Sequence, residues 1–222
     1  MPQPASLPAA ATPEQAARGF FSEYGSLFGV TNQAKQLSTL RTMTAADGRS
    51  FVRFQQVHNG VPVMGGELIV QVAAQGNGIL SASGETVAGE ALSTTPAVAS
   101  GSARETALAM AAKYYATGVS DLRCSRPSLW VYNPSVLGID RDQSSLVWRM
   151  DVRSANGQPV RELVLVDAQR GFVALHFSQI DTAKSRQVYN ASCGSTLPGT
   201  LARSEGQGAT GNTNVDKAYT YS

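Results

Sequence analysis

The side chains that most often perform chemistry are scarce in this sequence. It contains two histidines, His58 and His176, and two cysteines, Cys124 and Cys193. A helical zinc site needs two histidines one turn apart with a glutamate between them, because the metal and the general base must face the substrate together. The sequence has no His-Glu-x-x-His segment, G-x-S-x-G elbow, P-loop or C-x-x-C pair. We therefore expect no catalytic residue and no metal ligand in this chain.

One glycine pattern imitates a nucleotide-binding motif. Residues 206–211, GQGATG, satisfy G-x-G-x-x-G. This motif binds a pyrophosphate only when a strand precedes it and a helix follows it, with an acidic residue further on. We predict neither the strand nor the helix here, and therefore no nucleotide site.

The histidines and cysteines have ordinary explanations. His58 stands beside a predicted turn and is expected to be solvated, while His176 falls in a predicted strand. Cys124 and Cys193 fall in segments that we assign to different modules. A mutual disulfide is therefore not expected, although an oxidising compartment would permit one.

Length and composition indicate a small globular protein with many turns. The 222 residues suffice for one domain or two small ones, and 42% of them are apolar. The net charge of +2 comes from scattered basic residues, which gives no reason to expect nucleic acid or an anionic membrane as a partner. No segment approaches the ~18 apolar residues of a membrane span. Because no signal sequence is recognisable, we do not expect a complete secretory precursor, and residues 1–11 are assigned as a Pro/Ala-rich leader.

The strongest structural pattern is a hairpin over residues 51–72. Residues 51–57 have the aromatic and β-branched content of a strand, and residues 61–72 have that of a second. Between them, Asn59-Gly60 supplies the two residues with positive φ that a tight turn requires. The pattern predicts two antiparallel strands with one buried face.

A bend is expected in the second strand of this hairpin. Pro62 cannot donate to a β-ladder, and Gly65-Gly66 offers no side chain for packing. The strand should therefore bulge between Val61 and Glu67.

A helix and further strands complete a first module, residues 12–92. Thr12 and Gln15 form a capping box around Pro13, and apolar residues recur at helical spacing before Gly29: Ala16, Ala17, Phe20, Phe21, Tyr24, Leu27 and Phe28. Strands are predicted at residues 36–43 and 79–85, with a turn at residues 76–78 between the hairpin and the latter.

The same pattern restarts after a linker, residues 93–101, in a second module, residues 102–180. Ser102 and Glu105 predict a second capping box, and the helix that follows should end near Gly118. Strands are predicted at residues 129–132, 146–152, 160–167 and 172–178, with a hairpin turn at Asn156-Gly157. The fold class is therefore α+β, with two small modules that each pack a helix on an antiparallel β-meander.

The first module resembles a known family. Residues 53–56 (RFQQ), 60–63 (GVPV) and 65–68 (GGEL) are similar, in type and spacing, to the fungalysin/thermolysin propeptide (FTP) domain. This domain opens the prosegment of thermolysin-like zinc metallopeptidases. The second module resembles the PepSY domain that follows it there, through residues 129–132 (LWVY), 146–149 (LVWR) and 162–167 (ELVLVD). Residues 181–222 resemble a linker and the truncated start of the metallopeptidase domain.

The resemblance implies a non-enzymatic prosegment of a zymogen. Such a chain acts as an intramolecular folding chaperone and inhibitor, and its partner is the cognate metallopeptidase catalytic domain. Zinc and calcium are then expected only in that domain, with no cofactor in this chain, and a secreted or extracytoplasmic location is implied. The alternative is a stand-alone secreted protease-binding inhibitor built from the same modules.

Two sets of site residues follow from the resemblance. Partner-binding residues are expected around the bend: Phe54, Gln55, Gln56, Pro62, Gly65, Gly66 and Glu67. A cleavage or inhibitory segment is expected after the last strand: His176, Phe177, Gln179 and Ile180. Thermolysin-like proteases cut before bulky apolar residues, which favours Phe177 and Ile180. Alternatively, Phe177 is the last core residue and the cut lies between Asp181 and Tyr189.

Overall fold

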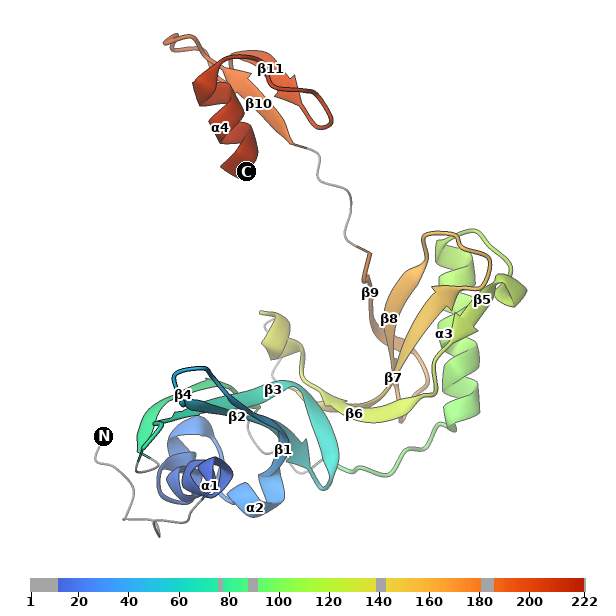
Figure 1. The fold of residues 1–222 in the computed structure, drawn as a ribbon. Coiled ribbons are helices and arrows are strands. Elements are labelled where there is room, and N and C mark those ends of the chain that lie inside the picture. The colour runs from blue at the N-terminus through green and yellow to red at the C-terminus, as the bar shows by residue number, and fades with distance from the viewer. Residues whose placement is uncertain (1–11, 76–77, 88–91, 139–142, 181–185, 222) are drawn as a thin grey trace. The chain divides into compact units, whose positions relative to one another are not determined.

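The computed structural model describes residues 12–75, 78–87, 92–138, 143–180 and 186–221 (Figure 1). The fold is α+β, as predicted. The chain divides into two compact units, Met1–Gln179 and Ile180–Ser222. The first unit contains a nine-stranded, mostly antiparallel sheet, in which β1-β2-β3-β6-β7-β8-β9 follow one another, β4 pairs with β3 and β5 pairs with β7.

The chain enters the first unit through a capped helix. Helix α1, Pro13–Tyr24, begins at the predicted capping box, since Thr12 accepts from the backbone of Gln15 and the Gln15 side chain accepts from Thr12. A 3₁₀ turn, Gly25–Phe28, follows. Its tighter winding rotates Leu27 off the apolar stripe and leaves it 65% exposed, so its predicted core position is wrong.

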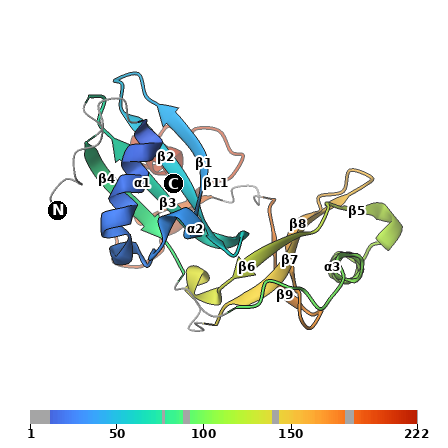
Figure 2. The same ribbon diagram turned by 90° about the horizontal axis from the view of Figure 1, so that it is seen from below.

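Four neighbouring strands of the sheet lie next to α1. They are β1 (Leu37–Thr44), β2 (Ser50–His58), β3 (Val61–Val72) and β4 (Ile79–Glu85), and a short helix, α2 (Gln33–Gln36), precedes β1. Helix α1 lies across the face of β2 and β3 (Figure 2), where it covers a core of Phe20, Phe21, Val52, Phe54, Leu68 and Val70. Asn59 and Gly60 have φ of 47° and 82°, which confirms the tight turn. Residues 76 and 77 of the other predicted turn lie outside the described residues.

The predicted bulge is present and large. Gln55 of β2 pairs with Glu67 of β3, and Val57 pairs with Pro62. Residues 63–66 of β3 therefore stand opposite the single residue Gln56. The bulge places Val63 beside β6, and Val63 forms a parallel pair there with Val131.

A longer helix, α3 (Ser100–Tyr114), opens the second part of this unit. The predicted capping box at Ser102 is wrong, because the N-cap is Ala99 and no side chain caps the helix. The backbone N–H groups of Ala97 and Val98 instead bond to the Ala168 carbonyl and fix where the helix begins. The helix also ends before Gly118, since Ala116 already has a positive φ of 49°. The boundary assigned to residues 93–101 remains a prediction.

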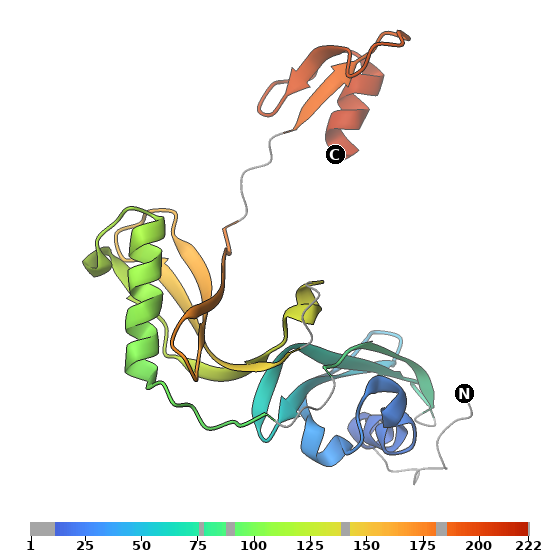
Figure 3. The same cartoon turned by 180° about the vertical axis from the view of Figure 1, so that it is seen from behind.

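The second part of the sheet packs against α3 (Figure 3). Its strands are β5 (Leu122–Cys124), β6 (Ser128–Tyr132), β7 (Ser145–Ser154), β8 (Arg161–Asp167) and β9 (Val173–Ser178), with 3₁₀ turns at Val119–Asp121 and Pro134–Leu137. Small buried residues of α3, Ala103, Ala107 and Ala111, let the helix approach β7 and β8 closely. The four predicted strands are present, whereas the three-residue β5 was not predicted.

The second unit, Ile180–Ser222, is a hairpin with one helix. Strands β10 (Gln187–Asn190) and β11 (Thr200–Ser204) pair antiparallel, and α4 (Thr213–Tyr221) follows. Of the described side chains in this unit, only those of Val215 and Tyr219 are buried hydrophobics.

Candidate protein-binding surfaces

Two buried glutamines hold the bulge of β3 in shape. The Gln55 side-chain nitrogen lies 2.6 Å from the carbonyl oxygen of Val63 and 2.9 Å from that of Gly66. The Gln56 amide donates to the Val87 carbonyl at 2.7 Å and accepts from the Val87 N–H at 2.9 Å. Because a bulge removes backbone groups from the ladder, these amides replace the missing partners.

Several predicted partner-binding residues therefore lie inside the unit. Phe54, Gln55, Gln56 and Gly66 are buried, and the Phe54 ring packs on Phe21 with centroids 5.7 Å apart. In this fold the two glutamine side chains hold the bulge and the Phe54 ring packs in the core, rather than facing solvent. Their role in binding a partner, direct or through that shape, stays a prediction.

The other three predicted residues reach the surface. Gly65 is exposed and has a φ of 75°, which favours glycine. Pro62 and Glu67 are half-buried, and the Glu67 carboxylate lies 3.4 Å from the Arg53 guanidinium. These residues, too, keep their binding role only as a prediction.

The bulge also contacts the β6 part of the unit. Val63 is buried with Val87 and Val131, and Met64 packs on a cluster that includes Tyr132. A Cβ atom on Gly65 would lie 3.3 Å from the Val136 side chain. The residues that resemble the propeptide family thus build a contact within the chain.

The cleavage or inhibitory segment lies at the end of β9. His176 is held in place because its Nδ1 lies 3.1 Å from Oε2 of Glu162. Phe177 and Ile180 are 46% and 37% exposed. Gln179 is tied to Arg161, through its backbone N–H to the Arg161 carbonyl and through its Oε1 to the guanidinium. The structure thus presents two bulky apolar side chains at this end, and the role of the segment stays a prediction.

The network around Glu162 was not visible in the sequence. The second carboxylate oxygen of Glu162 accepts from the Tyr115 hydroxyl at 2.6 Å. The ring of Tyr114 lies edge-on to that of His176, with centroids 5.2 Å apart. Two effects raise the pKa of Tyr115: burial of the hydroxyl, which is the larger, and its hydrogen bond to Glu162. Glutamate in a strand-like pattern gives no sign of burial, so only the fold reveals this cluster.

The environment of His58 differs from the one expected. His58 is half-buried rather than a solvated turn residue, and its Nε2 lies 3.0 Å from the Leu92 carbonyl. Cys124 and Cys193 are both free thiols.

The glycine pattern at residues 206–211 also needs a correction. Contrary to our prediction, β11 precedes it and α4 follows it. The last two N–H groups of the pattern are nevertheless occupied, because Thr210 and Gly211 donate to the Asp216 carboxylate at 2.9 and 3.1 Å. The protein's own carboxylate therefore takes the place that a phosphate would need.

A charged cluster organises the second unit. The Tyr219 ring lies between two guanidinium groups, with Arg186 at 4.0 Å and Arg203 at 3.8 Å from its centroid. Arg186 also makes a forked contact with both oxygens of Glu205, at 2.8 and 2.9 Å. Its hydrogen bonds lower the pKa of Glu205 to about 2.

Among the described residues, no group of three or more His, Cys, Asp or Glu side chains is placed to bind a metal ion. No helix in the same part of the chain is long and apolar enough to span a membrane.

Comparison with known proteins finds one family model that is similar to the part of the chain containing the bulge. Residues 35–85 match the Fungalysin/Thermolysin Propeptide Motif. The match to the propeptide motif covers less than half of the chain and includes β1 to β4, and it supports a protease propeptide role. No curated protein matches the chain. Among solved structures, the Bacillus megaterium YpeB C-terminal domain is similar at 10% identity and a TM-score of 0.37, over 79% of this chain and 68% of that one.

Proposed function

We propose that this chain is the prosegment of a secreted thermolysin-like metalloprotease, which it helps to fold and then inhibits. The observation that carries the proposal is the propeptide motif at residues 35–85. The catalytic domain, with its zinc and calcium, is the partner, and the second module acts as a PepSY domain. A stand-alone inhibitor built from the same modules is the second candidate, because the same surfaces would serve it.

The folding role has a physical basis. A large protease forms many non-local contacts, which form slowly and leave apolar surface exposed meanwhile. A preformed sheet that binds the folding intermediate lowers this barrier. Strand β9 ends the main strand order and pairs, among the described strands, with β8 alone, so its other edge can accept a strand of the partner.

Inhibition would use the segment after β9. A tethered blocker meets the cleft at an effective concentration on the order of mM, so modest affinity keeps the enzyme inactive until the tether is cut. Phe177 is part of β9, whereas Ile180 lies beyond the strand. Because cleavage requires an extended, accessible backbone, we expect the cut before Ile180 rather than before Phe177.

Inhibition in trans tests this function. The gene region that follows the codon of Ser222 is read for a His-Glu-x-x-His segment, and the encoded catalytic domain is assayed on casein with this chain added. We expect inhibition, which Phe177→Ser should weaken about tenfold by removing an exposed apolar contact. Leu80→Ser is the matched control, since Leu80 is 54% exposed on β4.

The outcomes separate the two candidates. N-terminal sequencing of the mature protease should find a start between residues 175 and 190. A frame that stops without a zinc motif, combined with inhibition of a separately encoded protease, would support the stand-alone inhibitor. Zinc-dependent casein cleavage by the chain itself would refute both.

A further inference from the structure

Three arginines stand side by side on the second part of the sheet. Arg123 of β5 is directly opposite Arg153 of β7, and Arg153 is directly opposite Arg161 of β8. Residues that are directly opposite each other in antiparallel strands carry their side chains on the same face. The three residues therefore form one row across neighbouring strands, which we call the arginine row, and all three are exposed.

The arginine row lies on the face of the sheet that α3 leaves open. Leu122 and Val152 belong to the apolar cluster that packs against α3. Because successive side chains of a strand point to opposite faces, Arg123 and Arg153, which follow these residues in β5 and β7, point away from the helix. The arginine row is thus accessible to a partner.

The charges of the arginine row are not neutralised within the described part of the chain, where none of its guanidinium groups forms an ion pair with a carboxylate. Two of these groups are held in place by neutral acceptors. Arg123 donates to the Leu122 carbonyl at 3.1 Å, and Arg161 donates to Oε1 of Gln179 at 3.1 Å. Like charges directly opposite each other destabilise a sheet. The row therefore weakens the isolated fold, and an anion supplied from outside would relieve the repulsion.

The spacing of the arginine row favours one shape of anion. Neighbouring strands lie ~4.8 Å apart, so a row over three strands spans roughly 10 Å. Residues at i, i+4 and i+7 of an α-helix share one face, with neighbouring Cβ atoms ~5–6 Å apart and a total rise of about 10.5 Å. An extended strand fits less well, because its side chains on one face recur only every ~6.8 Å.

The residues beside the arginine row favour a protein over a polyanion. In the next row on the same face, Asp151 is opposite Leu163, which is opposite Phe177. The Asp151 carboxylate would repel a nucleic acid or a polyphosphate chain that ran along this face. The Phe177 side chain is 46% exposed and offers an apolar contact, which a polyanion would not use.

We propose that the arginine row binds an amphipathic helix of a partner protein through acidic residues spaced at i, i+4 and i+7. Each carboxylate would pair with one guanidinium group, and an apolar residue beside them would cover Phe177. Binding would offset the repulsion between the three arginines. This interaction goes beyond the proposed prosegment role, because it requires only the row and a helix of this kind.

The test uses the whole chain and two blocked helical peptides of the same composition. One peptide carries its glutamates at i, i+4 and i+7, and the other carries them on different faces of the helix. Amide shifts of the ¹⁵N-labelled protein are followed by NMR at low ionic strength, where exposed charges are screened least. We expect the first peptide to shift the amides of Arg123, Arg153 and Arg161 and to bind about tenfold more tightly than the second.

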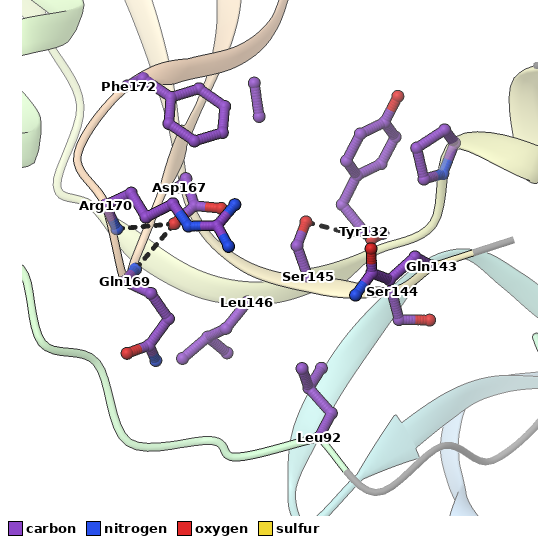
Figure 4. Close-up of a pocket in the computed structure, with 12 residues that line it drawn as sticks. Leu92, Tyr132, Gln143, Ser144, Ser145, Leu146, Asp167, Gln169, Arg170 and Phe172 are labelled. Carbon is purple, nitrogen blue, oxygen red and sulfur yellow. Dashed lines mark hydrogen bonds between the residues drawn. The ribbon is translucent and has the colours of Figure 1, made fainter. Parts of the chain in front are cut away.

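Two arginine variants form a matched pair. Arg153→Gln removes the central charge of the row, so it should abolish the preference for the first peptide. It should also raise the melting temperature of the free protein by about 1–3 °C, because the repulsion is lost. Arg170→Gln changes an exposed arginine that lines a cavity beyond the other end of β8 (Figure 4), and it should change neither property.

Several results would overturn the proposal. They are equal affinity for the two peptides, shifts confined to residues away from the row, and a preference that survives in Arg153→Gln. Tighter binding of polyphosphate than of the first peptide, at equal concentrations of negative charge, would also overturn it and assign the row to a polyanion. The assay contains no protease, so its outcome does not depend on the proposed prosegment role.

Discussion

His176 and Glu162 join the last strand of the first unit to its interior, with Nδ1 of the imidazole 3.1 Å from Oε2 of a carboxyl group that is only 1% exposed. The other oxygen accepts from Tyr115, the C-cap residue that directly follows α3. One buried carboxyl group therefore ties β8, β9 and the end of α3 together. Loss of this group should loosen the strand that we propose to meet the protease.

Removal of the carboxyl group should destabilise the fold. In Glu162→Leu, the Tyr115 hydroxyl and the His176 imidazole lose their acceptor, so we expect the free energy of unfolding to fall by about 2–4 kcal/mol. Tyr115→Phe should cost about 1 kcal/mol, because the carboxyl group keeps one partner. Urea unfolding followed by circular dichroism measures both. Glu105→Gln, on the exposed side of α3, is the control, and a loss in Glu162→Leu no larger than in the control would contradict the prediction.

The amide of Gln56 should be essential to the bulge. Gln56→Leu leaves the N–H and carbonyl of Val87 without partners in a buried site, which should cost about 2–4 kcal/mol in the free energy of unfolding. The control is Gln71→Ala on the opposite face of the same sheet, with an expected change within about 0.5 kcal/mol. Equal stability of the two variants in urea would show that the bulge does not depend on this amide.

Two glycines should respond in opposite directions to alanine. A Cβ atom on Gly66 would lie 2.6 Å from Oε1 of Gln56 and 2.9 Å from its Cβ, so Gly66→Ala should destabilise the unit by roughly 1–3 kcal/mol. Gly101 lies in α3 with nothing within 4 Å of such an atom. Gly101→Ala should therefore stabilise the protein by about 0.5–1 kcal/mol through helix propensity. Thermal unfolding compares them, and a melting temperature for Gly66→Ala at or above that of the parent would refute the close contact.

The second unit should lose its charged cluster only in strong acid. Hydrogen bonds from Arg186 lower the pKa of Glu205 from 4.5 to about 2. A lowered pKa means that this group contributes its full stability above pH 4.5, and that the contribution declines as the pH falls towards 2. A carboxyl ¹³C titration should give a midpoint near 2 for Glu205.

A matched pair of variants tests the cause of this shift. Arg186→Gln should move the Glu205 midpoint towards 4.5, while Arg126→Gln, at an exposed arginine of the other unit, should leave it unchanged. The same midpoint in both variants would show that the guanidinium is not responsible.

Local chemistry explains which elements the sequence could predict. The turn at Asn59-Gly60 and the cap at Thr12 each depend on neighbouring residues, and both are confirmed. The start of α3 could not be predicted, because Ala168, far along the chain, fixes the backbone of Ala97 and Val98. Strand β5 was missed for a related reason: three residues carry too short a pattern, and pairing with β7 supplies its stability.

The candidate sites also contain some features that the sequence could predict and others that it could not. The glycines and Pro62 indicated a bulge, since their backbone restrictions are intrinsic. The burial of Gln55 and Gln56 was hidden, because glutamine is usually exposed and only the bulge creates buried carbonyls for it to bind.

The pairing of Val63 with Val131 also affects how the protein can be divided into fragments. Val63, Val87 and Val131 are 2%, 7% and 3% exposed and form one apolar cluster. A polypeptide that stops between residues 93 and 101 would expose Val63 and Val87 to solvent. A polypeptide that begins there would expose Val131. Each half should therefore be poorly soluble alone and should recover when it is mixed with the other, so a self-sufficient fragment has to extend to Gln179.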